Sequence, residues 1–180
     1  MSRLTNIFLV GPMGVGKTTI AHQLAERLNL TFIDSDHEIE KHTGVTIPWI
    51  FEYEGEAGFR KRERAMIAEL TALDNIILST GGGVVLSASN RKHLQSRGYV
   101  IYLHASVDNL LERTAHSYNR PLLQTSDRRE KLESLFNERH PLYTQTADVT
   151  IETGQRSIRQ VVKAVLKHLQ KLDRHENITS

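Results

Sequence analysis

Short apolar runs alternate along the chain with longer segments of helical periodicity. The runs lie at residues 7–10, 31–33, 76–78, 99–103 and 149–151. The first, Ile7-Phe8-Leu9-Val10, is apolar at every position, as expected of a strand that is buried on both faces of a sheet. Strands that alternate with helices predict an α/β fold with a parallel sheet and right-handed crossover connections.

Helices are predicted between these strands. In the segment 18–28, Ile20, Leu24 and Leu28 share one helical face. Further helices are expected at residues 36–43, 89–97, 107–114, 128–139 and 157–172, with one or two over 48–73 that are broken near Gly55 and Gly58. Gly44 and Gly98 are expected to end the helices before them, and residues 173–180 to be frayed.

The composition limits the class of protein. A chain of 180 residues, 39% of them hydrophobic, suits a single globular domain over residues 1–180. The net charge of +2 lacks the basic excess of a nucleic-acid-binding protein, and the absence of cysteine excludes disulfides and thiolate metal sites. No segment has the length of a secretory signal or of a membrane span. We therefore expect a cytoplasmic protein without nucleic-acid or membrane partners.

A glycine-rich loop follows the first strand. The residues Gly11-Pro12-Met13-Gly14-Val15-Gly16-Lys17-Thr18 match the phosphate-binding pattern G-x-x-x-x-G-K-[ST] between a strand and a helix. Glycines let backbone N–H groups point at phosphate oxygens, and the helix N-terminus adds positive potential. Lys17 is expected to reach the β- and γ-phosphates of ATP, and the Thr18 hydroxyl to bind Mg²⁺. The motif leaves the phosphate acceptor open.

Two further motifs follow strands at the carboxyl edge of the predicted sheet, where ligands bind in such folds. Asp34 and Asp36 are expected to point to the same side of an extended segment, one toward the magnesium shell and the other toward an acceptor hydroxyl. Helix capping is the alternative role. The glycines at 81–83 are either a plain turn or a place where backbone approaches a ligand closely. Ordering three glycines costs entropy, and their place at the carboxyl end of a strand favours the second interpretation.

Several arginines are candidates for anion binding. Arg60 and Glu63 lie on one helix face, either as a surface ion pair or as a guanidinium fork for a substrate carboxylate that Glu63 steadies. Arg139, near a proline, is by default a solvent-exposed residue at a helix end. The polar loop 116–127 contains Arg120, which a closing lid can deliver to the transition state. Arg113 is placed to stack on an adenine.

Two aromatic residues and the histidines are not predicted to take part in catalysis or metal binding. Trp49 and Phe51 are interpreted first as core residues and second as a wall of the acceptor pocket. The nine histidines show no metal-ligand spacing and are interpreted as surface or core residues.

Together these motifs resemble the shikimate kinase family over residues 6–169. The resemblance rests on the segments 11–18, 34–36, 58–60, 81–83, 120–122 and 138–143, in this order. It implies a P-loop, nucleoside-monophosphate-kinase-like α/β fold of three αβα layers with a five-stranded parallel sheet, a mobile lid over about 114–127 and an acceptor-binding helical region over about 36–64. It also implies transfer of the γ-phosphoryl group of ATP to the 3-hydroxyl of shikimate.

The resemblance assigns the site residues as follows. Catalysis is expected of Lys17, Asp36 and Arg120; shikimate binding of Asp36, Arg60, Gly81, Gly82, Gly83 and Arg139; nucleotide binding of Gly11, Met13, Gly14, Val15, Gly16, Lys17, Thr18, Arg113, Arg120, Gln155 and Arg156; and Mg²⁺ binding of Thr18 and, through water, Asp34. The third strand ends in Ser79-Thr80 rather than in an aspartate, so Asp34 is the best carboxylate for the metal. A gluconate-type kinase and a catalytically silent ATP-binding scaffold are the alternatives. We expect a monomer.

Overall fold

The computed structural model describes residues 5–115 and 127–176, and within them the five predicted strands are confirmed. The strands are β1 (Ile7–Val10), β2 (Thr31–Asp34), β3 (Ile76–Ser79), β4 (Tyr99–His104) and β5 (Val149–Glu152). The helices are α1 (Lys17–Leu28), α2 (Ser35–Thr43), α3 (Ile47–Leu70), the 3₁₀ turn η2 (Val84–Leu86), α4 (Ala88–Arg97), α5 (Val107–Thr114), α6 (Arg128–Thr146) and α7 (Ile158–Glu176).

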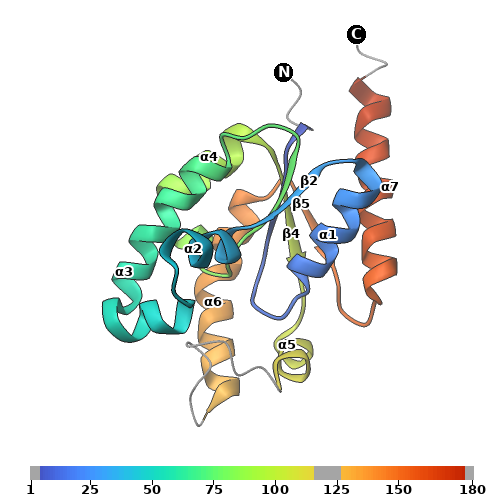
Figure 1. The fold of residues 1–180 in the computed structure, drawn as a ribbon. Helices are drawn as coiled ribbons and strands as arrows, with labels where there is room; N and C mark the ends of the chain where they lie inside the picture. The colour runs from blue at the N-terminus through green and yellow to red at the C-terminus, as the bar shows by residue number, and fades with distance from the viewer. Residues whose placement is uncertain (1–4, 116–126, 177–180) are drawn as a thin grey trace.

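The strands form one parallel sheet in the order β2-β3-β1-β4-β5. Figure 1 shows α1 and α7 on one side of this sheet and α2, α3 and α4 on the other, so the molecule has three αβα layers. Because β1 lies between β3 and β4, the loop after β1 emerges at the centre of the sheet's carboxyl edge. This is the topological switch point, where the connections from neighbouring strands run in opposite directions along the sheet.

The side chains of β1 point alternately to the two faces of the sheet and pack in two separate parts of the core. Ile7 and Leu9 pack in the cluster that contains α1 and α7, whereas Phe8 and Val10 pack in the cluster that contains α3 and α4. Successive side chains of a strand point to opposite faces, so an unbroken apolar run is what burial of both faces requires. The prediction that β1 is a fully buried strand is therefore confirmed.

The predicted helix boundaries are confirmed in part. Gly44 ends α2 with a φ of 72°, and α3 is broken at Gly55, where φ is 69°, while Gly58 stays helical. Gly98 ends α4 in an extended conformation. The predicted loop 116–127 lies outside the described residues except for Asp127, whose side chain caps α6.

Two predicted helix ends are wrong. Helix α6 does not end at Arg139 but continues through Pro141 to Thr146, because Tyr143 and Thr146 are buried beyond the proline. Proline removes only one backbone N–H from the helix, and burial on both sides of it offsets that loss. Helix α7 continues to Glu176, so residues 173–176 are not frayed, and the rest of that predicted segment, 177–180, lies outside the described residues.

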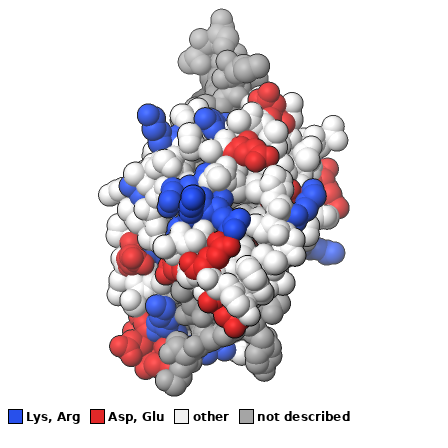
Figure 2. Space-filling view, turned by 60° about the vertical axis from the view of Figure 1, so that its left-hand side comes forward, with Lys and Arg blue, Asp and Glu red and all other residues white. Residues whose placement is uncertain are grey.

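The surface carries both signs of charge. Figure 2 shows a face on which basic side chains gather in one patch with acidic side chains directly beside it. No helix among the described residues is long and apolar enough to cross a membrane.

Candidate active site

The phosphate-binding loop joins β1 to α1 in a conformation that glycine permits. Gly11 has a φ of 147° and Gly16 a φ of 100°, both in a region that other residues rarely adopt. A Cβ on Gly11 would also collide with the carbonyl oxygen of Leu103. Helix α1 begins at Lys17 without a side-chain cap, so its first N–H groups remain available for an anion.

Lys17 lies folded against its own loop. Its Nζ donates hydrogen bonds of 2.7 Å to the Gly11 carbonyl and 2.9 Å to the Pro12 carbonyl, and the side chain is buried. These carbonyls keep the ammonium group within the loop that is shaped for phosphates. A desolvated cation at this place is available to compensate phosphate charge.

Thr18 and Asp34 form a second polar pair beside the loop. The Thr18 hydroxyl donates to Oδ2 of Asp34 at 2.8 Å and lies 3.3 Å from the Ser79 hydroxyl. The other oxygen of Asp34 accepts the N–H groups of Asp36 and His37 and so caps α2. The capping and metal-binding interpretations of Asp34 are therefore compatible. Asp36 does not continue an extended segment as expected, because α2 already begins at Ser35.

One open cleft of about 800 Å³ joins these groups. The predicted site residues that line it are Met13, Gly14, Gly16, Lys17, Thr18, Asp34, Asp36, Arg60, Gly81, Gly82, Gly83, Arg113 and Arg139. The structure does not place Gly11, Val15, Gln155 or Arg156 on its wall. Arg120 lies outside the described residues.

Asp36 is a buried carboxylate in the lining of this cleft. Burial, reinforced by the neighbouring Asp34 and Glu63, raises its pKa to about 7, although Lys17 and Arg60 act in the opposite direction. Within residues 5–115 and 127–176 its buried Oδ1 has no hydrogen-bond partner, and a Cβ on Gly81 would approach that atom to 2.8 Å. A carboxylate whose pKa lies near neutrality suits proton transfer to or from a bound hydroxyl.

Arg60 reaches the cleft from α3 with two glutamates beside it. Its guanidinium donates to Glu63 at 2.9 Å and to Glu56 at 3.1 Å, and its side chain is 15% exposed. Burial raises the pKa of Glu63, while the charge of Arg60 opposes this. The Arg60–Glu63 contact is therefore a buried pair and not the surface pair of the alternative interpretation. The guanidinium lies directly over Gly83, where it leaves no room for a Cβ.

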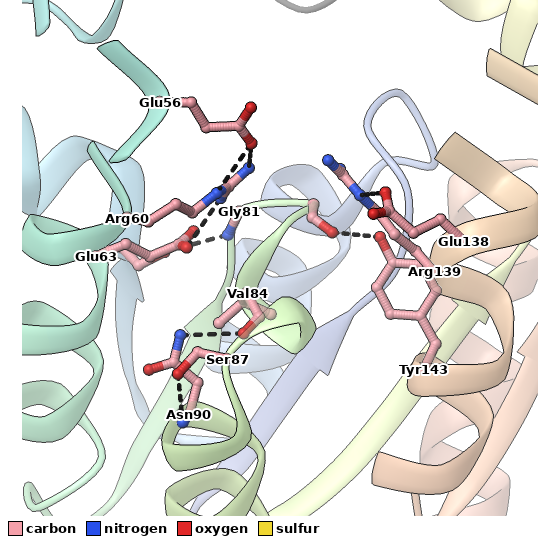
Figure 3. Close-up of polar contacts among 12 residues, drawn as sticks. Glu56, Arg60, Glu63, Gly81, Val84, Ser87, Asn90, Glu138, Arg139 and Tyr143 are labelled. Carbon is pink, nitrogen blue, oxygen red and sulfur yellow. Dashed lines mark hydrogen bonds and ion pairs between the residues drawn. The ribbon is translucent and has the colours of Figure 1, made fainter. Parts of the chain in front are cut away.

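Arg139 lies on the other side of the glycine segment, in the middle of α6. Its side chain is only 4% exposed, so the default expectation of a solvent-exposed arginine is wrong. Its Nε has no hydrogen-bond partner among the described residues and lies 3.8 Å from a Glu138 oxygen. A buried guanidinium with donor capacity left is a suitable partner for an anionic ligand group. Figure 3 shows Arg139 and Arg60 approaching from opposite helices.

Arg113 connects the phosphate-binding loop to the segment after β5. Its guanidinium donates to the carbonyls of Val15 and Gly154 and to the Thr153 hydroxyl. The predicted nucleotide-binding residues Gln155 and Arg156 directly follow this contact. Of these three residues only Arg113 lines the cleft, while Gln155 and Arg156 follow its partner Gly154 in the chain.

Some residues at the site are not among the candidates that the sequence predicts. Glu56 is one of them, although its spacing of four from Arg60 is the helical spacing of ion pairs. Tyr143 stands four residues after Arg139 and therefore on the same face of α6. Phe51 lines the cleft and packs on Phe59, as its second interpretation requires. Trp49 is not a core residue, since it is 41% exposed.

This fold, with its glycine-rich loop between β1 and α1, defines a P-loop kinase, and the guanidinium groups of Arg60 and Arg139 line its cleft. The family model of shikimate kinase matches residues 13–170. The chain is 54% identical over 171 residues to the shikimate kinase of Methylococcus capsulatus, covering 95% of this chain and 96% of that protein. It is 56% identical over 158 residues to that of Thiobacillus denitrificans, covering 88% and 86%. The chain belongs to the shikimate kinase family.

Solved structures agree with this assignment. The shikimate kinase of Acinetobacter baumannii in complex with shikimate superposes with a TM-score of 0.91 at 50% identity, covering 93% of this chain and 94% of that chain. A gluconokinase from Sinorhizobium meliloti has a TM-score of 0.61 at 17% identity and shares only the fold. The predicted fold class is confirmed, and of the alternatives the shikimate kinase interpretation is favoured.

Proposed function

We propose that this chain transfers the γ-phosphoryl group of ATP to the 3-hydroxyl of shikimate, as a member of the shikimate kinase family. The observation that carries the proposal is the cleft in which buried Arg139 and partly buried Arg60 lie on either side of the glycine segment, with Asp36 and Lys17 also in its lining. A carboxylated acceptor with a hydroxyl group fits that set of charges.

The two arginines hold the acceptor carboxylate. The Nε of Arg139 has no partner in the part of the chain that the structure describes, and Arg60 is kept in orientation by Glu63 and Glu56. Guanidinium groups recognise a carboxylate through paired, charge-assisted hydrogen bonds. With the carboxylate held here, the opposite edge of the small ring reaches toward Asp36.

Asp36 accepts the proton as the acceptor hydroxyl attacks the γ-phosphorus. The new O–P bond forms as the bond between the γ-phosphorus and the β–γ bridging oxygen breaks, and ADP leaves. Lys17 and the N–H groups at the start of α1 compensate the charge on the phosphate oxygens. Arg120, outside the described residues, is proposed to add a further cation from the lid. Positioning and charge compensation then account for most of the rate increase.

We also propose that Mg²⁺ is held at Thr18, with Asp34 in its outer shell. The hydroxyl of Thr18, the carboxylate of Asp34 and the nearby Ser79 hydroxyl are the oxygen donors that Mg²⁺ prefers. Among residues 5–115 and 127–176, no group of three or more His, Asp or Glu residues could hold a metal alone. This fits an ion that would be bound mainly through phosphates and water and would compensate the phosphate charge.

Arg113, together with the turn at Gln155 and Arg156, is proposed to contact the adenine. We propose a monomer as the working unit. The net charge of +2 supports small-molecule substrates and not nucleic acid as the partner. We propose a cytoplasmic location for the enzyme, where ATP is available.

A coupled assay of ADP release tests the proposal. The purified chain is incubated with ATP and Mg²⁺, with and without shikimate, and in parallel with gluconate and with nucleoside monophosphates. We expect ADP release that requires shikimate and a phosphorylated product at its 3-hydroxyl by NMR. Equal rates with gluconate would favour a gluconate-type kinase. Tight ATP binding without turnover of any acceptor would favour a silent scaffold.

A further inference from the structure

Side chains from two different helices hold the backbone of the glycine segment, and a side chain from a third helix holds the residue that follows it. The Gly81 N–H donates to the Ser35 hydroxyl of α2 at 3.2 Å, and the Tyr143 hydroxyl of α6 donates to the Gly82 carbonyl. Directly after the glycines, the Asn90 amide of α4 donates to the Val84 carbonyl at 3.0 Å. Figure 3 shows Tyr143 reaching this segment from the side opposite Arg60 and Glu63.

The contact from Tyr143 sets the direction of a peptide group in the cleft wall. A trans peptide is planar, so its carbonyl and its N–H point in opposite directions. When the Gly82 carbonyl points at Tyr143, the N–H of Gly83 must point away from α6. Among the described residues the N–H groups of Gly82 and Gly83 have no hydrogen-bond partner, so both remain available to a ligand. Without such a contact, glycine peptides rotate among many conformations.

Tyr143 is built as a fixed donor. Its side chain is 0% exposed, and its ring stacks on Tyr102 with centroids 4.9 Å apart. Burial raises the pKa of its hydroxyl, outweighing the lowering by Arg139 and Arg60, so the phenol keeps its proton and donates. Arg139 precedes it by one helical turn on the same face of α6. One rigid helix therefore carries both the proposed carboxylate ligand and the residue that orients the glycine backbone.

From this geometry we infer that Tyr143 is a positioning residue for the acceptor. Its hydroxyl aligns the peptide between Gly82 and Gly83 with the guanidinium of Arg139, so that backbone and side chain present their donors to one ligand together. The inference rests on the proposed function, because it concerns the acceptor side of the same cleft. The nucleotide side, around Lys17 and Arg113, does not depend on this contact.

The variant Tyr143→Phe tests the inference because it removes the hydroxyl and keeps the ring. Loss of one buried hydrogen bond that orders a ligand site is expected to raise the KM for shikimate about tenfold. The KM for ATP and kcat should each change by less than about threefold, because phosphate positioning is untouched. Direct titration of shikimate into the variant should show the same weakening.

Tyr102→Phe is the matched control. Tyr102 is also buried, stacks on the same ring, and places its hydroxyl 2.9 Å from Nδ1 of His140 instead of near a glycine. Its loss should lower the melting temperature about as much as Tyr143→Phe while leaving the KM for shikimate unchanged within about twofold.

Each outcome decides the inference. An unchanged KM for shikimate in Tyr143→Phe, an equal rise in both variants, or failure of Tyr143→Phe to fold would overturn it and assign the hydroxyl to general stability. If the variants give one of these results and the wild type still releases ADP only with shikimate, the proposed function stands. A wild-type chain without shikimate-dependent ADP release would contradict the proposed function itself.

Discussion

The hydroxyl of Thr18 donates a hydrogen bond of 2.8 Å to Oδ2 of Asp34 and so joins the phosphate-binding loop to the end of β2. The second oxygen of Asp34 accepts two N–H groups at the start of α2. One carboxylate therefore caps a helix on one side and faces the proposed metal site on the other. The two roles can be separated experimentally, because the first needs an oxygen acceptor and the second needs charge.

Asp34→Asn is expected to keep the cap and weaken the metal site. Asparagine caps helices about as well as aspartate, so the free energy of unfolding should change by less than about 0.5 kcal/mol. The Mg²⁺ concentration for half-maximal activity should rise about tenfold, because a neutral amide holds water around the ion less strongly. Asp34→Ala, as a comparison, should also lose about 1 kcal/mol of stability. An unchanged magnesium dependence in Asp34→Asn would remove Asp34 from the metal site.

Protonation of Asp36 is expected to lower the activity of the enzyme at acid pH. Burial beside Asp34 and Glu63 raises its pKa to about 7 in the free enzyme. Only the ionised form accepts a proton, so kcat/KM for shikimate should rise with pH and level off above about pH 7. The profile is measured under saturating ATP and Mg²⁺. A kcat/KM that stays flat from about pH 5.5 to about pH 8, a range that extends about one unit or more to either side of the pKa, would argue against Asp36 as the proton acceptor.

Ionisation of Asp36 is expected to affect stability in the opposite direction, so that the free energy of unfolding falls as the pH rises. Between its usual pKa of 3.8 and about 7, the folded chain binds more protons at Asp36 than the unfolded chain, so ionisation with rising pH lowers the free energy of unfolding. Asp36→Asn should therefore melt higher than the wild type at about pH 8, with the difference shrinking toward pH 5, where Asp36 is largely neutral. Thermal unfolding at both pH values measures it. Asp108→Asn, at an exposed carboxylate paired with Arg129, should show no such pH-dependent gain.

Arg60 and Arg62 offer a comparison within one helix. Arg60→Ala should raise the KM for shikimate by about ten- to a hundredfold with the KM for ATP unchanged, because a ligand carboxylate loses one of its guanidinium groups. It should also destabilise the fold by about 1–3 kcal/mol, since Glu63 stays buried without its partner. Steady-state kinetics with both substrates and thermal melts measure the two effects.

Arg62→Ala is the control for Arg60→Ala. Arg62 pairs with Glu54 at 2.6 Å, but its side chain is 42% exposed and it does not line the cleft. Exposed ion pairs contribute little, so both KM values should stay within about twofold of the wild type. A rise in the KM for shikimate equal to that of Arg60→Ala would place the effect in the helix as a whole.

Gly83 and Gly98 separate an acceptor effect from a packing effect. A Cβ on Gly83 would collide with the Arg60 guanidinium, the movable end of a long side chain. Gly83→Ala should therefore displace Arg60 and raise the KM for shikimate about tenfold with little loss of stability. A Cβ on Gly98 would instead collide with the buried ring of Phe8. Gly98→Ala should lower stability by about 1–3 kcal/mol and leave the KM for shikimate unchanged. If Gly83→Ala lowered stability without raising the KM for shikimate, and Gly98→Ala raised that KM, the assignment of Gly83 to the acceptor site would be contradicted.

The sequence by itself determined the strands, most helices and the phosphate-binding loop. Each depends on short-range physics: apolar runs such as Ile7 to Val10, the left-handed φ of Gly11 and Gly16, or the helical spacing of Arg60 and Glu63. The order of the motifs then pointed to the shikimate kinase family. These signals are readable because the residues that cause them stand within a few positions of one another.

Only the tertiary structure decided which polar groups are buried, and with what partner. The 4% exposure of Arg139 and the raised pKa of Asp36 arise from helices and loops that are distant in the sequence. The contact between Tyr143 and Gly82 spans 61 residues, and the continuation of α6 past Pro141 depends on burial beyond the proline. Desolvation is a sum over every element packed around a group, so no local pattern of residues contains it.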